Sequence, residues 1–249
     1  MIEEAEESED AAANPPVTRQ AGAAGSPPVE VVEAWGPVVD KLQLYADLLV
    51  DEGIVRGLIG PREVSRLWDR HLLNCLAAVE FVPTGSSVID LGSGAGLPGV
   101  VWAVARPDLD VELVEPLLRR VSWLDEVIER LGLVGVRVTR ARAEELRYQR
   151  SVDVVVARAV APLDRLAGWA LPLLRPGGQL LALKGATAAE ELQQARPSLA
   201  RLGYRSADVL HSEGHWVSRP TTVVQVVAGS GPAESGSRGP RAVARKRRR

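Results

Sequence analysis

The sequence has very little cysteine and histidine, and this scarcity excludes several kinds of site. Cys75 is the single cysteine in 249 residues, so no disulfide can form within the chain. Only three histidines are present, and His71 and Cys75 alone would supply just two ligands to a metal ion. We therefore expect no metal site and a reducing, cytoplasmic environment.

Long apolar runs are also missing. No stretch approaches the roughly 20 apolar residues that cross a bilayer. The acidic start lacks the basic residues and apolar segment of a secretory signal, so none is expected. Apolar residues nevertheless make up 46% of the chain, which is enough for a sizeable core. These features predict a globular protein without a membrane partner.

Charge is distributed unevenly, although the net charge is only −2. Residues 1–28 are acidic and rich in Ala and Pro, and residues 229–249 end in a run of Arg and Lys. Neither segment holds enough large apolar side chains to offset the entropy lost on ordering, so both are predicted to be disordered tails. Two interpretations of the basic tail stay open: non-specific attraction to phosphates, or a solvated end without a partner.

The region 29–82 has helical periodicity. Apolar side chains recur at helical spacing, and Gly60-Pro61 interrupts the pattern. A second helix is predicted from about 63 to 78. We expect these helices to form an N-terminal cap in front of the main domain, residues 83–228.

The main domain alternates between short β-branched runs and helical runs. This alternation predicts right-handed crossovers and a mostly parallel sheet. Seven strands are expected, at residues 88–91, 111–114, 136–138, 152–157, 178–183, 205–210 and 222–227. Helices are expected at residues 97–105, 117–131, 163–174 and 188–202. The last two strands follow each other without a helix, so we expect them to pair antiparallel.

A glycine-rich turn follows the first predicted strand and leads into a helix. In an open parallel sheet, ligands bind at the carboxyl ends of the strands, where this turn lies. Two patterns fit the turn: the dinucleotide fingerprint Gly94-x-Gly96-x-x-Gly99 and the methyltransferase pattern Asp90-x-Gly92-x-Gly94-x-Gly96. A third interpretation is a turn whose glycines serve tight packing alone.

Three features favour the methyltransferase pattern. Gly92 directly follows the strand, whereas a dinucleotide loop that begins at Gly94 would begin late. Asp90 places a carboxylate at the strand end, which suits a cationic ligand and would repel a pyrophosphate. The turn before the fifth strand, Leu174-Arg-Pro-Gly-Gly178, is common in class I methyltransferases. The sequence therefore predicts a class I, Rossmann-like α/β fold that binds S-adenosylmethionine, with a nicotinamide-dependent reductase as the alternative.

Acidic residues follow the next two strands. Glu115 ends the second strand, where a carboxylate can accept hydrogen bonds from both ribose hydroxyls; the other interpretation is a solvated strand end. Ala143-Glu144 follows the third strand, where such folds contact adenine. An acid at this position can also stabilise a helix N-terminus through the helix dipole, which is the alternative.

Three segments resemble the RsmG (GidB) family: Asp90-Leu-Gly-Ser-Gly-Ala-Gly-Leu-Pro-Gly99, Ala157-Arg-Ala-Val-Ala-Pro-Leu163 and Ala182-Leu-Lys-Gly185. The resemblance spans about residues 31–227. It implies an enzyme that transfers methyl from S-adenosylmethionine to N7 of one guanine in 16S rRNA of the small ribosomal subunit. A methyltransferase acting on a small molecule or a protein, and a binding module without a cofactor, stay open as alternatives.

The resemblance also assigns residues. It implies cofactor contacts at Gly92, Leu97, Ala143, Glu144 and Arg158, and it gives Glu115 the place of the family's acid after the second strand. The family motif Arg-His-x-x-Asp-Ser reads Arg70-His-Leu-Leu-Asn-Cys75 here, so an amide replaces a carboxylate at Asn74. The replacement retains size and most hydrogen bonding, so a structural role can survive it.

The implied reaction needs no general base, because guanine N7 carries an in-plane lone pair and no proton. Catalysis then depends on alignment and electrostatics. Arg158 is the first candidate to hold guanine O6 or the methionine carboxylate. Lys184 ends the fifth strand and is predicted to contact a phosphate, with a solvated strand-end lysine as the alternative.

RNA binding would depend on local basic patches, because the net charge is slightly negative. One patch would be a stripe on the second cap helix, formed by Arg62, Arg66 and Arg70. Another group lies around the third strand: Arg137, Arg140, Arg142, Arg147 and Arg150. We interpret His71, on the same cap helix, as a structural histidine and not as a catalyst.

Overall fold

A computed structural model describes residues 24–212, 214, 216 and 220–230. The α-helices are α1 (Val29–Trp35), α2 (Pro37–Leu48), α3 (Leu73–Ala78), α4 (Gly99–Ala105), α5 (Leu118–Leu131), α6 (Leu163–Ala170) and α7 (Ala188–Leu202). The strands are β1 (Ser87–Leu91), β2 (Asp110–Val114), β3 (Val136–Thr139), β4 (Val152–Arg158), β5 (Leu174–Lys184), β6 (Tyr204–Ser212) and β7 (Thr221–Ala228). Most of both predicted tails lies outside the described residues, so their disorder stays a prediction.

The strands form one sheet in the order β3-β2-β1-β4-β5-β7-β6. Strands β1 to β5 are parallel, whereas β7 is antiparallel to both β5 and β6. The predicted seven-stranded, mostly parallel sheet with an antiparallel final pair is therefore confirmed. The chain reverses its direction of progress across the sheet between β1 and β4, and such a switch point opens a crevice at the carboxyl ends of the strands.

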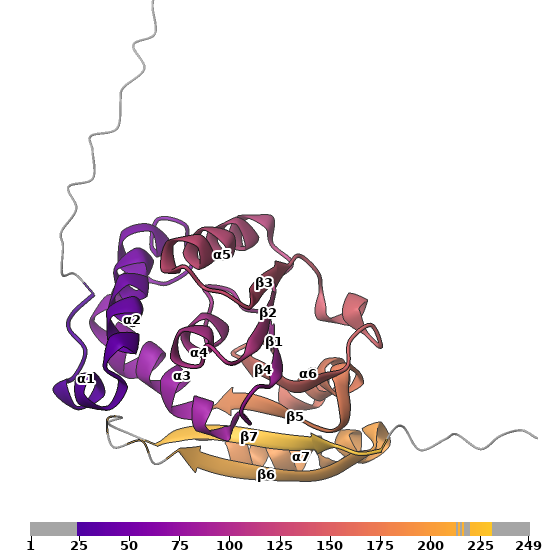
Figure 1. The fold of residues 1–249 in the computed structure, drawn as a ribbon. Helices are drawn as coiled ribbons and strands as arrows, with labels where there is room; N and C mark the ends of the chain where they lie inside the picture. The colour runs from indigo at the N-terminus through magenta and orange to yellow at the C-terminus, as the bar shows by residue number, and fades with distance from the viewer. Residues whose placement is uncertain (1–23, 213, 215, 217–219, 231–249) are drawn as a thin grey trace, which may run out of the picture.

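Helices cover both faces of the sheet (Figure 1). Helices α1 to α5 share one apolar core with one face, and α6 and α7 share a second core with the other. Strand β4 contributes to both: Val154 and Val156 belong to the first core, and Val155 and Ala157 belong to the second. Successive side chains of a strand point to opposite faces, so a continuous apolar run suits a strand that is covered on both sides.

Two predicted helices need correction. The helix expected at 163–174 ends at Ala170, and a short 3₁₀ turn, Leu171–Leu173, leads into β5. The helix expected at 63–78 is three segments: a 3₁₀ helix Pro61–Arg66, a π-helix Leu67–Leu72, and α3. In a π-helix each backbone N–H bonds to the carbonyl five residues earlier, which places Leu67 and Leu72 on one face. Both side chains are fully buried. The arginines at 62, 66 and 70 therefore do not form one α-helical stripe.

The helices of residues 29–82, called the cap below, are joined to the rest of the fold by buried and charged contacts. They share the first core with α4 and α5. The Trp102 indole N–H of α4 donates to the Cys75 carbonyl oxygen of α3 at 2.7 Å. At the rim, Arg56 pairs with Glu126 of α5 at 2.6 Å. These contacts fix the cap beside the glycine-rich turn that follows β1.

Glu112 of β2 is a charged side chain with no exposed surface. Burial alone would raise its pKa, but hydrogen bonds from Arg150, Thr139 and Arg137 outweigh burial and lower the pKa to about 2. The carboxylate is therefore charged and bonded at neutral pH. It ties the edge strand β3 and the loop that ends at Arg150 to β2.

We expect Glu112→Gln to lower the free energy of unfolding at pH 7 by about 2–3 kcal/mol, somewhat below the cost for a fully buried pair, because both arginines retain access to water. The folded-state pKa is lowered, so this stabilisation is present above the unfolded pKa near 4.5 and is lost as the pH falls towards 2. Urea denaturation of both proteins across this range measures the difference. Equal stabilities at pH 7 would contradict the assignment.

Candidate functional site

The chain leaves β1 through a turn that three glycines make possible. Gly92, Gly94 and Gly96 have φ of 71°, 58° and 108°, a region that side chains disfavour. The Ala95 carbonyl oxygen within the turn accepts hydrogen bonds from Tyr45 of α2 at 2.8 Å and from Trp123 of α5 at 2.9 Å. The turn is therefore clamped from two helices.

Asp90 lies beneath this turn and is completely buried. Its Oδ2 accepts a hydrogen bond from the Gly99 amide at 3.0 Å, whereas its Oδ1 has no partner among the described residues. Burial raises the pKa of Asp90 to about 7, despite the hydrogen bond from the Gly99 amide. A buried carboxylate oxygen without a partner is costly, and it fits a site that receives a positively charged group.

Glu115 follows β2 and points back to the turn. Its two carboxylate oxygens accept from the amides of Gly94 and Leu117, each at 3.0 Å. Arg120 of α5 approaches the same carboxylate at 3.6 Å, and its Nε is buried without a partner among the described residues. Glu115 is therefore not a solvated strand end; it is a fixed acceptor beside the turn.

A cavity of about 580 Å³ opens at this edge of the sheet. Gly92 and Glu115 line it, and Ala159 and Val160 after β4 form another wall. Its remaining lining residues follow β2 and β3: Pro116, Leu117, Arg120, Arg140, Ala141, Arg142 and Glu145. A Cβ on Gly92 would lie 2.9 Å from Val160 Cγ2, so this wall has room for glycine alone.

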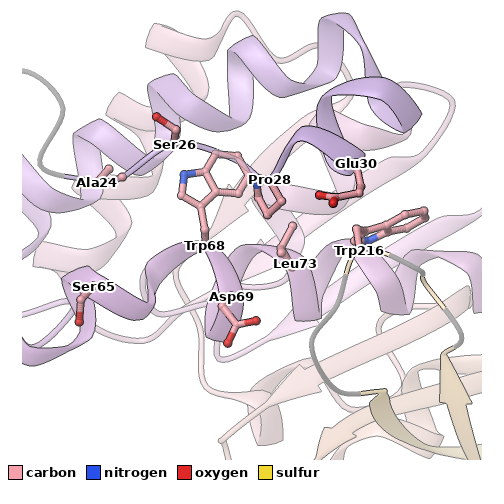
Figure 2. A pocket seen from close by; sticks show the side chains of 10 residues that line it. Ala24, Ser26, Pro28, Glu30, Ser65, Trp68, Asp69, Leu73 and Trp216 are labelled. Atoms are coloured by element: carbon pink, nitrogen blue, oxygen red, sulfur yellow. The ribbon is translucent and has the colours of Figure 1, made fainter.

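A second, smaller hollow of about 460 Å³ lies on the cap. Figure 2 shows the side chains around it, among them Trp68, Leu73 and Pro28. None of the residues that the sequence assigns to the cofactor lines this hollow. The candidate site is therefore the cavity at the carboxyl edge of the sheet.

Arg158, at the end of β4, turns towards the cap. It donates to His71 Nδ1 at 2.5 Å and to Cys75 Sγ at 3.2 Å. It also contacts the carbonyl oxygens of Arg70 and His71, both at 3.4 Å. Arg158 does not line the cavity, but its positive charge acts to lower the pKa of buried Asp90.

Lys184, the other predicted catalytic residue, is bonded within the fold. Its Nζ forms an ion pair with Glu191 of α7 at 2.6 Å and donates to the Ala161 carbonyl oxygen at 3.0 Å. The side chain is only 13% exposed and lines none of the described cavities. This geometry favours a role in fixing the loop after β4; contact with a phosphate stays a prediction.

The other predicted cofactor contacts lie around the turn and after β3. Leu97 is half-buried against the first core. Ala143 begins a 3₁₀ helix, Ala143–Leu146, and packs against the second core, whereas Glu144 is exposed. The cavity is lined instead by their neighbours, which sequence reasoning missed: Ala141, Arg142 and Glu145. Only the position after β3 pointed to this segment; the spacing within the loop gave no signal.

Asn74 stands where the family motif has Asp, and its side-chain amide is fully used in hydrogen bonds. The amide N–H₂ donates to the carbonyl oxygens of Asp69 at 3.2 Å and Arg70 at 2.8 Å. The amide oxygen accepts from Thr221 of β7 at 2.7 Å. A carboxylate could accept the bond from Thr221 but could not donate the other two. The two bonds within the cap therefore depend on the amide.

Comparison with known proteins decides the family. The family described as "GidB: rRNA small subunit methyltransferase G" matches residues 38–218, more than half of the chain. The chain belongs to this family. It is 58% identical to the ribosomal RNA small subunit methyltransferase G of Thermobifida fusca over 194 residues, covering 78% of this chain and 82% of the relative. The Streptomyces coelicolor protein of the same name is 53% identical over 213 residues, covering 84% and 89%.

A solved structure shares the fold. NSun6 from Pyrococcus horikoshii, crystallised with SFG, matches with a TM-score of 0.51 at 16% identity, covering 65% of this chain and 52% of that one. The family match and the close relatives, and not this likeness of fold, confirm the predicted resemblance to the methyltransferase G family. Of the two ligand patterns that fit the glycine turn, membership of this family decides for the methyltransferase pattern and against the nicotinamide alternative.

The structure adds two findings on membranes and metals. Among the residues it describes, no helix combines the length and apolar character needed to span a membrane. The same residues contain no group of three or more His, Cys, Asp or Glu side chains placed to hold a metal ion.

Two glycines of the turn provide a matched test of its geometry. A Cβ on Gly96 would lie 2.6 Å from Val100 Cγ2 and 2.9 Å from the Tyr45 hydroxyl, whereas a Cβ on Gly94 meets nothing closer than 3.7 Å. Both have positive φ, so both alanine variants are strained. We expect Gly96→Ala to lose about 1–3 kcal/mol more of unfolding free energy than Gly94→Ala, because it also overpacks the turn. Thermal denaturation compares them, and equal losses would refute the crowding.

Proposed function

We propose that this protein transfers the methyl group of S-adenosylmethionine to N7 of a guanine in 16S rRNA of the small ribosomal subunit. One observation carries the proposal: Gly92 of the glycine turn and a fixed Glu115 line one cavity, next to a buried, half-paired Asp90, in a chain of the methyltransferase G family. Such a substrate would place the enzyme in the cytoplasm.

The residues of the site fit the proposed cofactor. Glu115 would accept from the ribose hydroxyls, and the bare backbone at Gly92 would let the nucleoside approach closely. Asp90 suits the α-ammonium group of the cofactor, and the Arg158 guanidinium, whose charge acts on Asp90, suits the methionine carboxylate. When bound, S-adenosylmethionine would supply an electrophilic methyl group.

The chain's own residues would then align the reactants and exclude water. The turn is clamped at Ala95 and cannot shift without breaking two hydrogen bonds. No side chain needs to remove a proton, because guanine N7 carries none. Alignment by a rigid site and fixed charges is therefore the whole of the proposed catalysis.

Exposed arginines around the site suit an RNA backbone. Arg140 and Arg142 line the cavity rim, and Arg62 and Arg66 are exposed on the cap. Phosphate contacts of this kind would position the RNA without reading its sequence. Binding should accordingly weaken with salt.

The central test is methyl transfer to purified small ribosomal subunits from cells that lack this gene. With S-adenosylmethionine labelled in the methyl group, we expect label in 16S rRNA, recovered after digestion as N7-methylguanine. Methyl transfer is compared with two other acceptors, naked 16S rRNA and a mixture of ribosomal proteins. Binding of NADH and of S-adenosylhomocysteine is measured separately. Label in protein alone would overturn the proposal. So would a protein that binds NADH and does not bind S-adenosylhomocysteine.

A second expectation follows from the raised pKa of Asp90. The carboxyl is largely protonated at pH 6 and charged at pH 8. Only the charged form attracts the α-ammonium group of the ligand. Affinity for S-adenosylhomocysteine should therefore rise from pH 6 to pH 8. Asp90→Asn should bind about tenfold more weakly at pH 8, the equivalent of one pKa unit, and should lose the pH dependence. Calorimetric titration at several pH values measures both, and an equally steep rise in the variant would contradict the role.

A further inference from the structure

The position of Arg158 is set by the cap and not by its own strand. Among the described residues, the side-chain hydrogen bonds of Arg158 go to three cap residues: Arg70, His71 and Cys75. The two contacts to backbone carbonyls are long, at 3.4 Å. The 2.5 Å contact to His71 Nδ1 is the shortest, so this ring nitrogen is the main acceptor.

The other nitrogen of the same ring is also bonded. His71 Nε2 lies 2.8 Å from the Glu63 carboxylate. A guanidinium only donates hydrogen bonds, so Nδ1 must accept and the ring proton must lie on Nε2, where it is donated to Glu63. Glu63, neutral His71 and Arg158 thus form one chain of hydrogen bonds in a fixed order.

The surroundings of His71 favour this neutral tautomer. Its side chain is only 14% exposed, and burial lowers its pKa, as does the positive charge of Arg158. The Glu63 carboxylate acts in the opposite direction, and Arg70 adds to the lowering. A protonated ring would point an N–H at the guanidinium and break the chain of hydrogen bonds.

We propose that His71 is a positioning residue whose Nδ1 holds the Arg158 guanidinium against the cofactor's methionine carboxylate. This inference rests on the proposed function. A purely structural reading makes the same contact a clamp between cap and sheet, which any side chain of similar size would serve. The two interpretations differ in whether Arg158 needs a hydrogen-bond acceptor at the position of Nδ1.

Two amide substitutions separate the ring nitrogens. The Asn oxygen of His71→Asn can take the place of Nδ1, so an acceptor for Arg158 remains while the bond to Glu63 is lost. The longer side chain of His71→Gln reaches the place of Nε2, so the contact with Glu63 can remain while the acceptor for Arg158 is lost. His211, which is exposed on β6 and bonded to Thr222, provides matched controls as His211→Asn and His211→Gln.

Calorimetric titration with S-adenosylhomocysteine and methyl transfer to small subunits are measured for all four variants, with thermal unfolding as a check on folding. We expect His71→Asn to stay within about threefold of the wild type and His71→Gln to lose at least about tenfold in cofactor affinity, as a misplaced binding group should. Both His211 variants should match the wild type.

Each result decides the role of His71. Equal losses in the two amide variants, or no loss in either, overturn the inference. A difference that appears only in kcat, with unchanged cofactor affinity, also overturns it, because Arg158 would then act on guanine instead of the cofactor. If the wild type binds S-adenosylhomocysteine but methylates no guanine, the proposed function fails, and the affinity comparison of the two amides still tests His71.

Discussion

Two side chains from different helices donate to one carbonyl oxygen in the turn after β1, and the site depends on this junction. Tyr45 and Trp123 hold Ala95 in place, and the glycines on either side allow the backbone to bend around it. The bend leaves the Gly94 amide facing Glu115 and the backbone of Gly92 facing the cavity. Without the clamp, the flexible glycines would cost entropy each time the cofactor bound.

Two buried carboxylates of the sheet, Glu112 and Asp90, differ in how well their oxygens are hydrogen-bonded. Glu112 shows the stabilising case, because hydrogen bonds from three side chains satisfy its carboxylate. Asp90 shows the opposite case, because one of its oxygens is buried without a partner in the described part of the chain and its pKa rises to about 7. A fold retains such a cost where a bound group removes it, and unpaired groups of this kind gather at functional sites.

The cap contacts strands that lie far from it in the sequence. Arg158 of β4 bonds to the cap, and Asn74 of the cap bonds to Thr221 of β7. Here the Asn-Cys pair replaces the family's Asp-Ser, yet both residues have partners that suit their own chemistry. The cap is thus part of the site's geometry, and a change in its packing should reach Arg158.

The sequence by itself determined the alternating strands and helices, the glycine turn, Asp90 beneath it and Glu115 beside it. These follow from local rules, because strand period, glycine conformations and strand-end carboxylates are visible within a few residues. Only the tertiary structure decided that β7 lies between β5 and β6, that the second cap helix breaks into three, that Arg158 faces His71 and that Lys184 pairs with Glu191. The long-range pairings join residues brought together by packing, and periodicity carries no information about a partner 87 positions away.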